Sequence, residues 1–150
     1  PVSAAIRAAG WAEAALLASA LTTGDPTVTS PDGASATAHL DDLDGTVTVT
    51  VRCGTPLDHT VLRSYCTGAA HMALGWIRSE GLAVDDRGVP LDLTIRSFGI
   101  LRAVDMPRVD VHVEADDGPP VNGSDAVFAA VAAAAWRAAG RPDRIPLRSS

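Results

Sequence analysis

The sequence predicts an α+β fold, with two or three helices packed on antiparallel strands. Three observations support this class. The segment Thr46–Val51 alternates threonine and valine, which is typical of a strand with one buried face. Segments with apolar residues at helical spacing stand before and after the strands. At 150 residues, without repeats or an internal linker, the chain has about the length of one domain and can bury a core.

The first predicted helix covers Ser3–Leu21, and Ile6, Leu17 and Leu21 share one of its faces. Residues 22–36 are rich in Gly, Asp and Pro, which favour turns. We therefore predict a surface loop after the first helix.

Two strands are predicted next, Thr37–Leu40 and Thr46–Cys53, joined by a turn. In the second strand, the valines at positions 47, 49 and 51 fall on one face because side chains alternate along a strand. We expect this face to be buried.

A helix follows, with Asp58 as its N-cap and Gly81 at its C-terminal end. One stripe of this helix has the spacing of a core face. It consists of Val61, Tyr65, Met72 and Trp76.

Small residues gather on the same helix. They are Gly68, Ala69, Ala70, Ala73 and Gly75. Because glycine inside a helix costs roughly 1 kcal/mol relative to alanine, they indicate that something lies close to the helix. It is another backbone, another helix or a bound cofactor, and the spacing leaves these three open.

The second half predicts a hairpin, with strands Leu82–Val84 and Val89–Ile95 around a turn. Val109–Val113 alternates as a further strand. Ser124 or Asp125 is expected to cap a last helix that ends at the glycine in position 140. Its predicted buried side consists of Val127, Phe128, Val131 and Trp136.

Composition excludes several classes of function. The net charge of -6 leaves no basic face for nucleic acid. No apolar run reaches the ~18 residues of a membrane span, so we expect no membrane partner. Two cysteines without a secretory signal predict reduced thiols in a cytoplasmic protein. The spacing of Cys53, His59, Cys66 and His71 fits no zinc pattern, which predicts structural roles and no metal ligands.

The order of several motifs resembles one known family. Cys53-Gly54, Leu57, Gly68 and Leu74-Gly75-Trp76 are similar to the C-terminal part of the molybdopterin-binding large subunit of the xanthine dehydrogenase / aldehyde oxidase family of molybdenum hydroxylases. That family has a Cys-Gly turn here, followed by a helix that ends in Gln-Gly-Leu-Gly.

The likeness continues downstream at matching spacing. It includes Asp85–Gly88, Thr94–Ile100 with Ala103, Asp105 and Pro107, and Gly118-Pro119-Pro120 before the last helix. It covers residues 37–140 of a predicted single domain, 1–150. An N-terminal helix and loop (1–36) and a tail (141–150) flank this core.

The resemblance implies a domain that helps to enclose a molybdopterin cofactor. The residues at the family's cofactor-contacting positions are Gly68, Met72, Ala73, Gly75 and Gly118. The family's catalytic glutamate, a general base, falls on Gly118 or Pro119, neither of which can accept a proton. Asp116 and Asp117 lie beside this position, and we expect them to form a solvated acidic loop.

Met72 stands where the family has a pterin-contacting glutamine, and thioether sulfur donates no hydrogen bond. The residues retained from the family pattern are those that pack, and the missing ones are polar. We therefore predict no catalytic residue in this chain and no activity in isolation.

Two functions remain. The chain is a small subunit or C-terminal domain of a molybdenum hydroxylase-type oxidoreductase, sharing molybdopterin with a larger molybdenum-binding chain. Alternatively, it is a stand-alone, non-catalytic interaction module, without cofactor and as a homo-oligomer.

Overall fold

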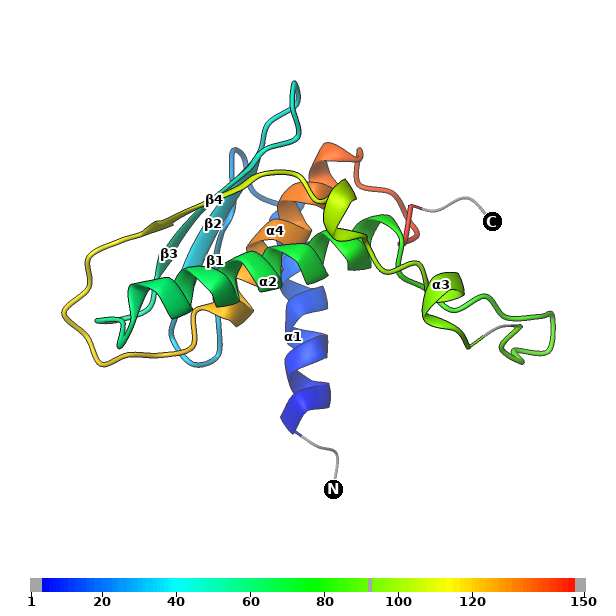
Figure 1. The fold of residues 1–150 in the computed structure, drawn as a ribbon, viewed down its shortest axis with the longest axis horizontal. Coiled ribbons are helices and arrows are strands. Elements are labelled where there is room, and N and C mark those ends of the chain that lie inside the picture. Colours follow the sequence, from blue (N-terminus) through cyan, green and yellow to red (C-terminus); the bar gives the residue numbers. More distant parts are fainter. Residues whose placement is uncertain (1–3, 92, 148–150) are drawn as a thin grey trace.

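The computed structural model describes residues 4–91 and 93–147; Ser3, Asp92 and residues 148–150, which carry parts of the predicted elements, lie outside the described residues. The predicted α+β class is confirmed (Figure 1). The elements follow in the order α1 (Ala4–Ser19), β1 (Thr27–Thr29), β2 (Ser35–Leu40), β3 (Val47–Arg52), α2 (His59–Arg78), α3 (Ile95–Phe98), the 3-10 turn η1 (Ala103–Asp105), β4 (Val109–Val113) and α4 (Ser124–Ala138).

The four strands form one sheet in the order β1-β2-β3-β4. The pairs β1–β2 and β2–β3 are antiparallel, whereas β4 runs parallel to β3, with Val47 opposite Val109 and Val51 opposite Val113. The sheet is therefore mixed, where we predicted antiparallel strands. The physical reason is that β3 and β4 are joined by a helical crossover through α2 and not by a hairpin.

One face of the sheet is buried, and its opposite face carries threonines. Val47, Val49 and Val51 are at most 1% exposed, which confirms the predicted inner face of β3. The predicted loop at 22–36 contains β1, which the sequence did not reveal because three residues are too few to show alternation. A tight turn, with the N–H of Ser30 donating to the carbonyl of Ala34 (2.7 Å), pairs β1 with β2.

Helix α4 lies at the centre of the fold, where it packs on the sheet and on both α1 and α2. Its predicted buried residues Val127, Val131 and Trp136 are buried, and Phe128 is half-buried. Helix α2 packs chiefly on α4 through a buried side made mostly of small residues. Alanine allows two helices to approach closely, so for the buried alanines of α2 the predicted neighbour is another helix.

The predicted core stripe of α2 was wrong. Val61, Tyr65 and Met72 are 49%, 67% and 55% exposed, and Trp76 is half-buried. The stripe has the spacing of a core face. Close contact between α2 and α4 requires the alanine side of α2 to face α4, so the side of α2 with the bulky residues faces outward. The Trp76 ring stacks on Phe128, with the ring centroids 5.5 Å apart.

Two element boundaries of the predicted helices also change. Asp58 is the N-cap of α2 as predicted, and it accepts from the backbone N–H groups of Thr60 and Val61. The helix ends at Arg78, before the predicted Gly81, because the N–H groups of residues 79 and 80 both turn back to one carbonyl.

Neither Ser124 nor Asp125 caps α4. Its N-cap is a glycine at 123, and the Asn122 side chain accepts from the backbone of residue 124.

Helix α1 buries a different side from the predicted one. Ala12 and Leu16 are 6% and 5% exposed, whereas Leu17 and Leu21 are 63% and 90% exposed. The side chain of Ile6 lies outside the described residues. Within the described residues, no helix combines the length and hydropathy that a membrane crossing requires.

The predicted hairpin at 82–95 is reduced, within the described residues, to one isolated bridge between Val84 and Pro90. Ile95 belongs to α3 and not to a strand. The chain has the alternation of a hairpin here but no sheet beside it on which to extend the pairing.

Candidate functional site

The best candidate site lies where β3 and β4 end. Because these strands are parallel, their carboxyl ends meet at one edge of the sheet, where α/β folds place ligands. The turn after β3 leads into α2, and the segment 114–123 leads from β4 into α4. Pairing continues past β4, since the N–H of Glu114 donates to the carbonyl of Val51 (2.9 Å).

Gly54 is the point at which the two connections touch. It has φ +74°, and a Cβ built on it would lie 2.0 Å from the carbonyl oxygen of Pro119 and 2.8 Å from that of Gly118. The N–H of Thr55 donates to the Gly118 carbonyl (2.9 Å). The Cys-Gly turn of the sequence is therefore explained by contact between two backbones, which only glycine allows at this position.

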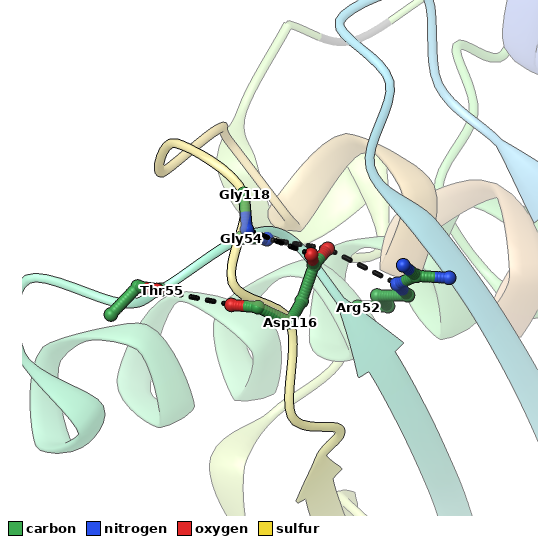
Figure 2. Close-up of polar contacts among 5 residues, drawn as sticks. All are labelled: Arg52, Gly54, Thr55, Asp116 and Gly118. Carbon is green, nitrogen blue, oxygen red and sulfur yellow. Dashed lines mark hydrogen bonds and ion pairs between the residues drawn. The ribbon is translucent and has the colours of Figure 1, made fainter.

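Hydrogen bonds of Asp116 also stabilise this contact between the two connections (Figure 2). Its carboxylate accepts from the backbone N–H groups of Gly118 (3.0 Å) and Gly54 (3.1 Å), and from Nε of Arg52 (3.1 Å). Its carbonyl accepts from the Thr55 hydroxyl (3.0 Å). The hydrogen bonds from Gly118 and Gly54, and then from Arg52, hold the pKa of Asp116 below its ordinary value.

The prediction of a solvated acidic loop is therefore wrong for Asp116, whose side chain is only 20% exposed, and right for the exposed Asp117. A carboxylate that accepts three hydrogen bonds while ionised is a weak base, so Asp116 is poorly suited to accept a proton. Sequence reasoning missed this anchor because its partners lie 62 and 64 residues away along the chain.

A groove of about 320 Å³ joins this loop to the first half of α2. Its lining is mostly apolar, and it consists of Cys53, Pro56, Leu57, Asp58, Val61, Leu62, Tyr65, Pro120, Val121, Asn122 and Gly123. Leu57 on its rim is 92% exposed. The groove has the chemistry of a surface that packs against an apolar neighbour.

The apolar surface continues along the outer side of α2. We call Val61, Tyr65, Gly68 and Met72 the outer stripe; these residues are spaced by three and four and are exposed. A second groove of about 350 Å³ lies at the far end of the stripe, where Met72 and Trp76 meet Phe128 and α1. Apart from the backbone of α2 itself and the two neighbouring residues, no described atom lies within 4 Å of a Cβ built on Gly68.

The residues at the family's cofactor positions thus separate into two groups. Ala73 is fully buried in the core, and a Cβ on Gly75 would lie 2.2 Å from Oε1 of Glu80. The chain's own packing explains both. Gly68 and Met72 lie on the outer stripe, and Gly118 lies on the loop that Asp116 holds. Cofactor contact at these positions stays a prediction.

The two cysteines are buried and His71 is hydrogen-bonded within the fold, whereas His59 is exposed. Burial, and then the charge of Asp116, raises the pKa of the Cys53 thiol; burial, and then Cys53, raises that of Cys66 to about 11. Thiols of this kind are neutral and unreactive at pH 7. His71 donates from Nε2 to the carbonyl of Leu101 (2.7 Å). Across residues 4–91 and 93–147, no three metal-binding side chains form a cluster.

No family model matches the sequence. No curated protein sequence matches it either. Among solved structures, reconstituted CO dehydrogenase from Oligotropha carboxidovorans is similar with a TM-score of 0.59 and 12% identity, over 71% of this chain and 15% of that one. Quinoline 2-oxidoreductase from Pseudomonas putida 86 is similar with a TM-score of 0.50 and 18% identity, over 68% and 14%. Cu,Mo-CO dehydrogenase in its carbon monoxide-reduced state gives a TM-score of 0.51 and 13% identity, over 72% and 15%.

At these identities the likeness shows the fold alone. The chain has a fold that occurs within these oxidoreductases, and the matched part spans 14% or 15% of each of their chains.

Proposed function

We propose that this chain is a C-terminal domain or small subunit of a molybdenum hydroxylase-type oxidoreductase, similar to the xanthine dehydrogenase family. Its role is to help enclose the molybdopterin site of a larger, cytoplasmic molybdenum-binding chain. The shared fold and the order of motifs in residues 37–140 support this proposal.

One observation carries the proposal: the outer stripe of α2 is apolar and exposed. The stripe and the groove beside the loop form one apolar surface. Exposed apolar surfaces of this kind mark interaction sites. Gly68, at the middle of the stripe, leaves room for a backbone or a flat group to approach α2.

These residues do not fit a cofactor held by this chain alone. A pterin needs hydrogen-bond partners, and the outer stripe offers one side-chain hydroxyl, that of Tyr65, beside aliphatic and thioether groups. Asp116 uses both of its oxygens on groups of this chain, one on Gly118 and the other on Arg52 and Gly54. We therefore assign packing to this chain, and binding and catalysis to the larger chain, so that the isolated chain has no activity.

The test is purification together with the native neighbours of this chain, followed by molybdenum analysis and identification of the chains by mass spectrometry. We expect co-elution with a larger molybdenum-containing chain. Met72→Glu should weaken this association, because it buries a charge in the apolar stripe. Leu43→Glu, on the exposed turn between β2 and β3, is the matched control and should leave it intact. A metal-free homo-oligomer would contradict the proposal and support the stand-alone interaction module.

A second experiment tests the position of the loop. Gly118 does not have a positive φ, and a Cβ on it would lie 3.2 Å from Oδ1 of Asp116, so a small shift accommodates a side chain. In the assembled complex, we expect Gly118→Glu to raise hydroxylase activity if the loop faces the metal. Unchanged activity in a fully assembled complex would place the loop away from the metal.

A further inference from the structure

A second apolar surface lies on the segment that follows α2. Between α2 and β4, residues 82–105 form an arm: its first part, through α3, projects beyond the C-terminal end of α2, and its last part returns beside α2 (Figure 1). The described part of the arm has only α3, η1 and one isolated bridge as regular structure. Connections of this length without more secondary structure are uncommon in compact domains and are usually functional or disordered.

The arm exposes aliphatic side chains along its whole length. Eight of them are between 44% and 81% exposed. They are Leu82, Val84, Val89, Leu91, Leu93, Ile95, Ile100 and Val104. Four of these, Val89, Leu91, Leu93 and Ile95, stand at every second position of the sequence. A run of this kind is too large to be ordinary surface variation, and it indicates a docking surface.

The arm is also held in shape. At its tip, the Asp85 carboxylate accepts from the backbone N–H groups of Arg87 (2.8 Å) and Val89 (2.9 Å), and Leu91 donates to the carbonyl of Ala83 (2.9 Å).

At its base, the N–H of Gly81 donates to the carbonyl of Phe98 (2.9 Å), and His71 binds the carbonyl of Leu101. A surface that is ordered before it binds loses little conformational entropy on docking.

We propose that the arm binds an apolar groove of the larger molybdenum-containing chain. This inference rests on the proposed function, and it names a second point of attachment. Three features favour such an occupant over a second copy of this chain.

First, the arm and α1, which exposes Leu17, project from the body in different directions (Figure 1). A two-fold dimer buries one patch on each copy, so it cannot cover surfaces that diverge. Second, two copies each carrying a net charge of -6 repel one another. Third, in the structures of similar fold, the matched part is 14% or 15% of a much larger chain.

The experiment compares Leu91→Glu with Leu43→Glu in the full chain, co-produced with its native neighbours. Both leucines are exposed, at 68% and 97%, so both variants should fold, which circular dichroism checks. We expect Leu91→Glu to weaken binding to the larger molybdenum-containing chain about tenfold or more, and Leu43→Glu to leave it unchanged.

The remaining outcomes separate this inference from the proposed function. If the wild-type chain binds the molybdenum-containing chain and Leu91→Glu binds equally well, the inference that the arm binds this chain is wrong and the proposed function stands. If the wild-type chain forms only a metal-free oligomer, both are wrong. If Leu91→Glu dissociates that oligomer, the arm binds a second copy instead.

Discussion

The carboxylate of Asp116 accepts a hydrogen bond from the backbone N–H of Gly54, at 3.1 Å, and so joins the loops that follow β3 and β4. The same carboxylate binds Gly118 within its own loop. The Asp116 side chain thus holds the backbone of both loops together. This relationship determines how the candidate site responds to mutation.

Asp116→Asn should lower the melting temperature at pH 7, because the loop loses the charge that strengthens its hydrogen bonds. The pKa of Asp116 in the folded chain lies below its ordinary value of 3.8, mainly through the backbone of Gly118. Its ionisation therefore stabilises the fold above pH 3.8, and this contribution is lost as the pH falls through the lowered pKa.

Thermal unfolding of both proteins at pH 7 and at acid pH, below the ordinary pKa of 3.8, measures the effect. The difference in melting temperature should narrow in acid. Asp117→Asn, at the exposed neighbour, is the control. An equal loss from both variants would refute the role of Asp116 as an anchor.

Gly54→Ala and Gly68→Ala should change stability in opposite directions. At Gly54 an added Cβ meets backbone at 2.0 Å and φ is positive, so we expect a loss of at least about 2 kcal/mol in the free energy of unfolding. At Gly68 the space is open and the backbone helical, so alanine should add up to about 1 kcal/mol. Urea unfolding compares the two, and a neutral Gly54→Ala would contradict the close backbone contact.

Ala73→Leu should cost about 1–3 kcal/mol, because Ala73 is fully buried on the side of α2 that packs in the core. The adjacent exposed residue offers a control. Met72→Leu should change the free energy of unfolding by less than about 0.5 kcal/mol. If chemical denaturation ranks the two variants in the reverse order, the helix is rotated from the orientation described above.

Stability should fall in alkali as the buried Cys66 thiol resists ionisation. Below pH 9.0 the thiol is neutral in both the folded and the unfolded chain, so its titration has no effect. Above pH 9.0 the unfolded chain gains a thiolate, whereas the folded thiol keeps its proton until about pH 11. The free energy of unfolding should therefore fall by roughly 2–3 kcal/mol across this interval.

Cys66→Ala, measured by urea unfolding over the same pH range, removes this titration. Its stability should depend less on alkaline pH than that of the wild-type chain. Parallel curves for the two proteins would mean that Cys66 is accessible to solvent.

Local patterns predicted much of the fold. The alternating valines of β3 and the segment Val109–Val113 form strands as expected, and Asp58 caps α2. In each case the signal lies within a few residues. The prediction was wrong for the outer stripe of α2. The spacing of apolar residues identifies one face of a helix, but it does not show which neighbour covers that face.

The candidate site was harder to predict. The sequence placed the empty glutamate position at Gly118 or Pro119, but it gave no sign that Asp116 binds Gly54. Hydrogen bonds between distant segments depend on the tertiary fold, and no spacing rule applies to them. The parallel pairing of β3 and β4 escaped prediction for the same reason.

That pairing also has a consequence for the order of folding. Strands β1, β2 and β3 are joined by short turns and meet at little entropic cost, whereas Val47 meets Val109 only after a long loop closes. We expect β4 to join the sheet late, with its amides gaining protection after those of β2 in pulsed hydrogen exchange. Until then β3 is an unprotected edge, and the nascent chain is open to aggregation along a strand that is buried at the centre of the finished sheet.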